Sequence, residues 1–267
     1  MAVVDYEVKD NVAIVTLNRP EALNAVSPEL ACRLADAWNT ARDDENVRVI
    51  VVTGTGKGFC AGMDLGASAP LITGAKKPVT EWDHRVVSHE NTVNRALLRD
   101  MDCEKPVIAA VNGLAIGGGC EIVQGSDIRV ASTAAKFGLG EVRWGVMPSG
   151  GSTARLPAQI PFARAMEILL TGAFISAEEA LAVGLVNHVV PPDQLMTKAL
   201  EIAALIKANA PFSVRSIRAS ARACIGVPEQ LALKIEQQFV NQVAKSEDAQ
   251  EGPKAFMEKR KPVYKGR

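Results

Sequence analysis

Two glutamates, each placed after glycines in an apolar stretch, are the residues in this sequence most suited to chemistry. Glu121 follows three consecutive glycines in NGLAIGGGCEIVQGSD (112–127), and Glu141 follows Gly140 in KFGLGEVRWGVMP (136–148). Glycine loses the most conformational freedom on folding, so a run of it indicates a backbone that must approach another group closely. Apolar surroundings raise a carboxyl pKa toward neutrality, where proton transfer is useful. The pattern predicts acid/base chemistry beside exposed backbone.

Each glutamate also has a simpler interpretation. A carboxylate in the first turn of a helix, where Glu121 is expected, often only complements the helix dipole. Glu141 could instead be the ion-pair partner of Arg143 or Arg155. Two glutamates in similar glycine-rich, apolar contexts favour the catalytic interpretation.

A second glycine-rich loop, TGTGKGFCAGMDL (53–65), has the same design as the first: a buried strand followed by glycines. It contains G-x-G-x-x-A at Gly56, Gly58 and Ala61, as dinucleotide-binding loops do. No long amphipathic helix follows, and no acid lies about 20 residues further on, so that function is disfavoured. Two such loops could instead direct one N–H each at a single oxygen, forming an oxyanion hole.

The elements that position these loops alternate between strands and helices, which predicts an α/β fold with mostly parallel pairing. Ser27 is a good N-cap and Pro28 a good first residue for one helix. Strands are expected at 3–8, 12–17, 47–54, 105–111 and 127–131, and further helices at 81–101 and 118–125. The segment 67–80 is expected to be a mobile loop. From about Pro192 only helices are expected, and we place a boundary near 210–211 between a body, 1–210, and a helical C-terminal region, 211–267.

Composition excludes several classes of protein. Thirty basic residues balance thirty acidic ones in 267, so no net field attracts nucleic acid or an anionic membrane. Five scattered cysteines without a C-x-x-C pair favour a reducing compartment, and no targeting segment or spanning apolar run is found. The three histidines do not form H-E-x-x-H, and no G-x-S-x-G occurs. We expect a cytoplasmic protein without a metal site.

Several motifs together resemble the crotonase, or enoyl-CoA hydratase/isomerase, superfamily. The similar stretches are NRPEALNAVSPEL (18–30), GKGFCAGMDL (56–65), AAVNGLAIGGGCEIVQGSDIRVA (109–131), KFGLGEVRWGVMPSGGSTARLP (136–157) and LLTGAFISAEEALAVGLVNHVVP (169–191). The resemblance covers nearly the whole chain. It implies a spiral of ββα units with a helical trimerisation region, usually assembled as a dimer of trimers.

The resemblance also implies roles for individual residues in the hydration of a 2-enoyl-CoA to a 3-hydroxyacyl-CoA. Met63 and Gly118 would supply the oxyanion-hole N–H groups, Glu121 would activate water, and Glu141 would deliver a proton to the α-carbon. The residues implied in coenzyme A binding are Ala61, Asp64, Leu65, Phe256 and Lys259, the last two often reaching an adjacent subunit. Coenzyme A enters with the substrate, and no other cofactor is expected.

Some positions depart from the hydratase pattern. Ser149 stands where many hydratases have a glycine beside the water, and Met63 and 145–147 add bulk near the acyl path. Leu139, Trp144 and 67–80 are expected to shape the acyl pocket. RLPAQIP (155–161) is similar to members that dehydrate carnitinyl-type thioesters. Such a dehydratase and an enoyl-CoA delta isomerase remain alternatives, although isomerases commonly keep only the second acid. A non-catalytic acyl-CoA or RNA-binding scaffold is an alternative of another class.

Overall fold

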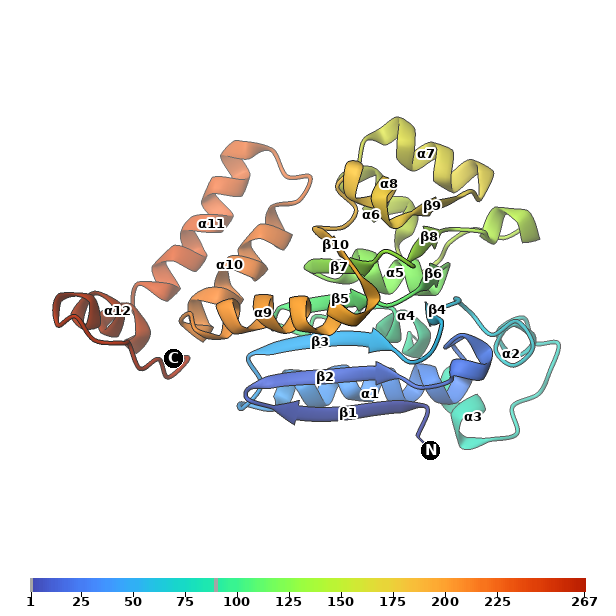
Figure 1. Ribbon diagram of the computed structural model, residues 1–267, viewed down its shortest axis with the longest axis horizontal. Helices are drawn as coiled ribbons and strands as arrows, with labels where there is room; N and C mark the ends of the chain where they lie inside the picture. The colour runs from blue at the N-terminus through green and yellow to red at the C-terminus, as the bar shows by residue number, and fades with distance from the viewer. Residues whose placement is uncertain (1, 89–90) are drawn as a thin grey trace.

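A six-stranded sheet and a four-stranded sheet form the centre of the protein (Figure 1). The computed structural model describes residues 2–88 and 91–267. The larger sheet has the order β1-β2-β3-β5-β7-β10, and only its first pair, β1 with β2, is antiparallel. Its strands are β1 (Val4–Lys9), β2 (Val12–Leu17), β3 (Val49–Gly54), β5 (Val107–Val111), β7 (Ile128–Ser132) and β10 (His188–Val190). The α/β class and the mostly parallel pairing predicted from sequence are confirmed.

Helices cover both faces of the larger sheet, which explains why its central strands are continuously apolar. Ile50 and Val52 of β3 belong to the core shared with α1 (Pro28–Asp43). Val49 and Val51 point the other way and pack with α9 (Leu195–Lys207). Successive strand residues face opposite sides, so each helix receives every second side chain.

The smaller sheet has the order β4-β6-β8-β9 and holds the glycine-rich turns. Its strands are β4 (Gly58–Cys60), β6 (Leu114–Ile116), β8 (Lys136–Gly138) and β9 (Phe174–Ser176). Helix α5 (Gly118–Gly125) follows β6 directly, has the predicted bounds and is buried along its whole length. A Cβ atom on Gly119 would lie 2.1 Å from the Cys60 carbonyl oxygen, so only glycine lets α5 pack this closely on β4.

Three helices at the C-terminal end extend away from the sheets (Figure 1): α10 (Pro211–Cys224), α11 (Glu229–Val243) and α12 (Glu247–Met257). Buried ion pairs attach α10 to the body, because Arg218 and Arg222 both bind the carboxylate of Asp127, at 2.8 and 2.7 Å. No residue of α11 is buried in the single chain. The division of the chain into two domains at 210–211 stays a prediction.

Two sequence-based expectations are wrong in detail. The helix expected over 81–101 is divided into α3 (Glu81–Ser88) and α4 (Thr92–Ala96), and positions 89–90 of the expected helix lie outside the described residues. Asn91 and Leu98 adopt positive φ, 75° and 56°, which a continuous helix does not permit. The expected loop 67–80 contains the short helix α2 (Ala69–Ile72).

The remaining short elements connect these layers. They are η1 (Pro20–Ala22), η2 (Glu141–Trp144), α6 (Ser152–Gln159), α7 (Phe162–Thr171), α8 (Ala177–Ala182) and η3 (Pro192–Gln194). Glu141 and Ser152, the first residues of η2 and α6, therefore lie within one short stretch of chain that follows β8.

Candidate active site

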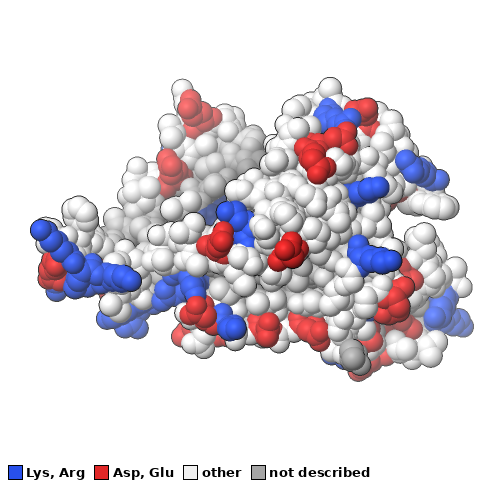
Figure 2. Space-filling view, in the orientation of Figure 1, with Lys and Arg blue, Asp and Glu red and all other residues white. Residues whose placement is uncertain are grey.

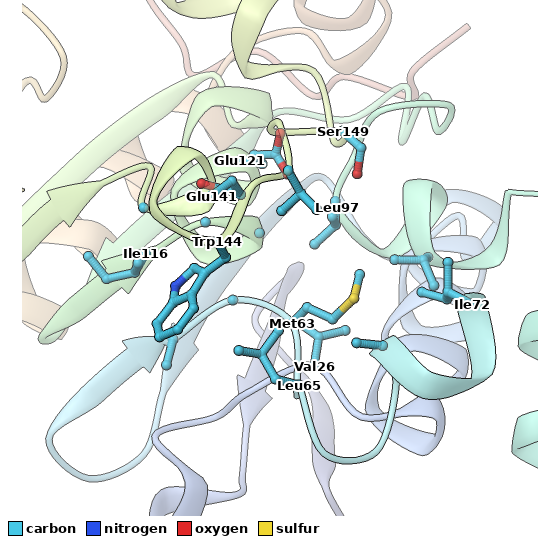
Figure 3. A pocket seen from close by; sticks show the side chains of 18 of the residues that line it. Val26, Met63, Leu65, Ile72, Leu97, Ile116, Glu121, Glu141, Trp144 and Ser149 are labelled. Atoms are coloured by element: carbon cyan, nitrogen blue, oxygen red, sulfur yellow. The ribbon is translucent and has the colours of Figure 1, made fainter. Parts of the chain in front are cut away.

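A pocket of about 410 Å³ lies where the two glycine-rich turns meet (Figure 3). Eight of the residues singled out in the sequence line it: Ala61, Met63, Leu65, Gly118, Glu121, Glu141, Trp144 and Ser149. In Figure 3 both glutamates and Ser149 lie along one side of the pocket, with Met63 facing them across the opening. The structure therefore brings residues from separate segments to one place.

The backbone N–H groups of Met63 and Gly118 are without acceptors among residues 2–88 and 91–267. Val26 donates to the Gly62 carbonyl at 2.8 Å and accepts from Asp64 at 3.1 Å, which leaves the intervening Met63 N–H outside this bridge. Gly118 is the first residue of α5, where N–H groups have no partner within the helix. The two turns adjoin, since a Cβ on Gly62 would lie 3.4 Å from the Gly118 nitrogen.

Glu121 is buried, with 2% of its surface exposed, in the first turn of α5. Its Oε1 accepts the N–H of Ser152 at 3.2 Å, at the start of α6. Burial raises the pKa of this carboxyl, while the Ser152 and Gly150 N–H groups and the charge of Arg155 act in the opposite direction. The Glu121 carboxylate is thus bound by the start of α6 and does not interact only with the dipole of its own helix, α5.

Glu141 lies close to the turn that contains Gly117 and Gly118 but has fewer partners. A Cβ on Gly117 would lie 3.1 Å from Oε1, and Oε2 is buried with no hydrogen-bond partner among the described residues. Burial raises the pKa of this carboxyl, and the nearby charge of Glu121 raises it further.

The suggested pairing of Glu141 with Arg143 or Arg155 is wrong. The guanidinium of Arg143 lies over the ring of Phe174, 5.4 Å from its centre. Arg155 donates to the Leu98 carbonyl oxygen at 2.5 Å. The Glu141 carboxyl therefore forms no ion pair with either arginine.

Two residues expected at the substrate have other surroundings. Leu139 is fully buried in the hydrophobic core and is not among the residues that line the pocket. Asp64 accepts hydrogen bonds from the N–H groups of Gly66 and Ala67 and pairs with Arg19 at 3.1 Å. Its carboxylate thus stabilises the loop that carries Met63.

Phe256 and Lys259 lie far from the pocket, at the opposite end of the molecule. Phe256 belongs to α12, which Figure 1 shows far from α2 and α5, and its side chain is 85% exposed. Neither residue lines the pocket of its own chain.

Three lining residues had no signal in the sequence: Val26, Val93 and Leu97. The lining residues Ala69, Ile72 and Thr73 belong to the segment 67–80, which was expected beside the acyl group. Leu97 is the most informative, because its side chain would meet a Cβ on Gly118 at 3.1 Å and one on Gly150 at 2.9 Å. It therefore packs between the turn of Gly118 and the loop that holds Glu121. Its place results from tertiary packing, which helical periodicity alone does not reveal.

Residues 2–88 and 91–267 contain no cluster of three or more His, Cys, Asp or Glu side chains that could hold a metal ion. The face in Figure 2 shows basic and acidic side chains in small interspersed groups. Within the same residues no helix has the length and apolar character needed to span a membrane.

The fold and the pocket define a class of α/β protein that presents paired backbone donors and two carboxyls to one ligand. A family model described as Enoyl-CoA hydratase/isomerase matches residues 7–267. The chain belongs to the enoyl-CoA hydratase/isomerase family.

Individual relatives are similar over almost their full length. Enoyl-CoA hydratase EchA19 of Mycobacterium tuberculosis is 45% identical over 98% of this chain and 96% of its own. The (E)-benzylidenesuccinyl-CoA hydratase of Thauera aromatica is 41% identical over 98% of this chain and 99% of its own. A crystal structure of enoyl-CoA hydratase from Bacillus anthracis matches with a TM-score of 0.88 and 36% identity, covering 99% of this chain and 100% of that one.

Proposed function

We propose that this protein is an enoyl-CoA hydratase that reversibly adds water across the α,β double bond of a 2-enoyl-CoA. One observation carries the proposal: two carboxyls and two unbonded backbone N–H groups line the same pocket. The hydratase names of similar proteins support the same reaction.

The N–H groups of Met63 and Gly118 would bind the thioester oxygen. As the oxygen of water adds to the β-carbon, negative charge moves onto the thioester oxygen and an enolate develops. Oxyanion-hole donors in other enzymes contribute about 3 kcal/mol each to the transition state. The position of Gly118 at the start of α5 adds the positive end of a helix dipole.

The surroundings of the two glutamates differ in a way that suits an acid and a base. Burial raises the pKa of Glu121, but the Ser152 N–H and the charge of Arg155 oppose this rise and stabilise its ionised form. Glu141 has an unpartnered oxygen and faces the charge of Glu121, which favours its protonated form. Glu121 would take a proton from water as the hydroxyl joins the β-carbon, and Glu141 would give its proton to the α-carbon.

Coenzyme A would pass along the side of the pocket formed by Ala61 and Leu65. Because α12 is remote from this pocket, Phe256 and Lys259 would contact coenzyme A only in another copy of the chain. We therefore include a homo-oligomer, a trimer or a dimer of trimers, in the proposal. The reaction needs no cofactor other than the coenzyme A of the substrate, and the proposed location is the cytoplasm.

The test is hydration of 2-enoyl-CoA esters, followed by loss of the conjugated enoyl-thioester absorbance. The expected product is the 3-hydroxyacyl-CoA, and mass spectrometry should show the gain of one water. Formation of a shifted double bond without added water would identify an isomerase instead. Binding without turnover of any ester would favour a non-catalytic scaffold. No observation on the described residues favours an isomerase, a non-catalytic scaffold or a carnitinyl-type dehydratase over a hydratase.

A further inference from the structure

One end of the pocket is an apolar track that leads from the reacting groups to solvent. It is formed by Leu97, Val93 and Ile72, all of which line the pocket. Leu97 is 4% exposed, Val93 is partly buried, and Ile72 is 52% exposed. The gradient in exposure shows that the track begins in the interior and ends open at the surface.

Helix α4 fixes the inner part of the track beside the reaction point. Leu97 touches the positions of Gly118 and Gly150, next to the proposed thioester oxygen and Glu121. Val93 lies four residues earlier, so it falls on the same side of the helix, one turn away. A ligand tail leaving the reaction point can therefore follow one continuous apolar surface.

Helix α2 forms the outer part of the track. Ile72 faces the pocket from the side opposite Trp144 in Figure 3. Thr73 is next to it, but its hydroxyl donates to the Ala69 carbonyl at 3.0 Å. The Thr73 hydroxyl is thus bonded to its own helix, and this end of the pocket offers mainly hydrocarbon contacts.

The pocket extends beyond the reaction point toward solvent. It measures about 410 Å³, which includes the side formed by Ala61 and Leu65, and it opens to solvent at Ile72. An acyl group too short to pass Leu97 would leave Val93 and Ile72 uncovered. Exposed clusters of large apolar side chains usually mark binding surfaces.

The charges that line the pocket restrict the acyl group further. Glu121 and Glu141 are its two charged lining residues, and the lining contains no lysine, arginine or histidine. A carboxylate on the acyl group would meet the charge of Glu121 and no cation among these residues. An uncharged acyl group fits this lining best.

We propose that the substrate is an uncharged enoyl-CoA whose acyl chain is longer than four carbons and whose tail lies along Leu97, Val93 and Ile72. This inference rests on the proposed hydratase function and specifies its substrate class. The open end at Ile72 sets no sharp upper limit on chain length.

The first experiment compares binding of two saturated esters, decanoyl-CoA and butyryl-CoA, by calorimetry, so that chemistry is not required. Buried methylene groups each strengthen binding, and the six additional ones should lower Kd roughly tenfold or more. Hydration of 2-decenoyl-CoA should likewise exceed that of crotonyl-CoA roughly tenfold in kcat/KM, and glutaconyl-CoA, with its acyl carboxylate, should be the poorest substrate. Equal Kd values for the two saturated esters, or a preference for the shorter one, would overturn the inference while leaving hydratase function intact.

Ile72→Asp tests the placement of the tail. A carboxylate at this position should reduce kcat/KM for 2-decenoyl-CoA roughly tenfold more than it reduces kcat/KM for crotonyl-CoA. Val79→Asp is the matched control, since Val79 is 75% exposed on the same connecting segment but does not line the pocket. Equal effects of Ile72→Asp on both esters, or equal effects of the two variants, would show that the tail does not lie there. If no enoyl-CoA is hydrated but decanoyl-CoA binds more tightly, the hydratase proposal fails and the acyl track stands.

Discussion

Replacement of Gly150 by alanine should disable Glu121 without unfolding the protein. A Cβ at this position would lie 2.3 Å from Glu121 Oε2 and 2.7 Å from its carboxyl carbon, too close for real atoms. The backbone at Gly150 does not have the positive φ that would itself exclude alanine. The flexible end of Glu121 is the atom group that can yield, and it must move about 1 Å to restore normal contact.

A displacement of that size should lower kcat about 100-fold, since errors of roughly 1 Å in a reacting group can have this effect. Stopped-flow or steady-state hydration of an enoyl-CoA measures kcat, and calorimetry with a saturated acyl-CoA should show nearly unchanged binding. Gly66→Ala is the matched control, because its Cβ would meet Asp64 at an ordinary 3.6 Å.

A double-mutant cycle identifies the cause of the loss. If Gly150→Ala acts through Glu121, it should have little further effect in a Glu121→Gln background. The new Cβ would also lie 2.9 Å from Leu97 Cδ1, so a disturbance of Leu97 is the competing explanation. The same 100-fold loss in both backgrounds would refute the assignment of Glu121 and indicate Leu97 instead.

Three further changes test the rest of the site. Glu141→Gln should lower kcat by about 10²- to 10⁴-fold with acyl-CoA binding retained, whereas near-normal turnover would remove Glu141 from the mechanism. Gly118→Pro deletes one N–H donor and should lower kcat about 10²- to 10³-fold if circular dichroism shows a folded protein; full activity would contradict the oxyanion hole. Burial raises the pKa of Glu141, so the folded protein binds this proton more tightly than the unfolded chain, and stability contributed here is lost as pH rises. Glu141→Gln should therefore raise Tm at pH 8 and have little effect on Tm near pH 4, and a loss of Tm at pH 8 would contradict this sign.

Local signals were sufficient for some of the elements around the glycine turns. Ser27 caps α1 as expected, accepting the Leu30 N–H at 3.2 Å, because a cap depends on residues only three positions apart. The helix over 118–125 and the strand β5 were likewise predicted from short runs of glycine and apolar residues. The strands of the smaller sheet, which holds the glycine turns, are three residues long each and were not among the expected strands. The catalytic roles of Glu121 and Glu141 remain predictions, although the structure brings both to one pocket.

The walls of the pocket could not be predicted because they depend on long-range packing. Leu97 and Val93 belong to a region that was expected to be one uninterrupted helix, and the left-handed backbone at Asn91 separates α4 from α3. Leu139 was expected to shape the acyl pocket, but its side chain is buried in the core. The neighbouring Gly140 and Glu141 do line the pocket, so the segment is placed as expected and this side chain is not.

The position of α12 bears on whether one chain is a complete enzyme. Arg260 pairs with Glu251 at 2.5 Å, and Asp248 accepts the N–H of Gly266 at 2.8 Å, so the chain after α12 is bonded back onto that helix. These contacts hold the last residues of the chain on α12, which lies at its own end of the molecule, while Phe256 stays exposed. If Phe256 binds coenzyme A, a second copy must bring it to the pocket. Phe256→Ala should then weaken acyl-CoA binding only at concentrations where the oligomer forms, and an equal loss in a monomeric sample would contradict a contact between subunits.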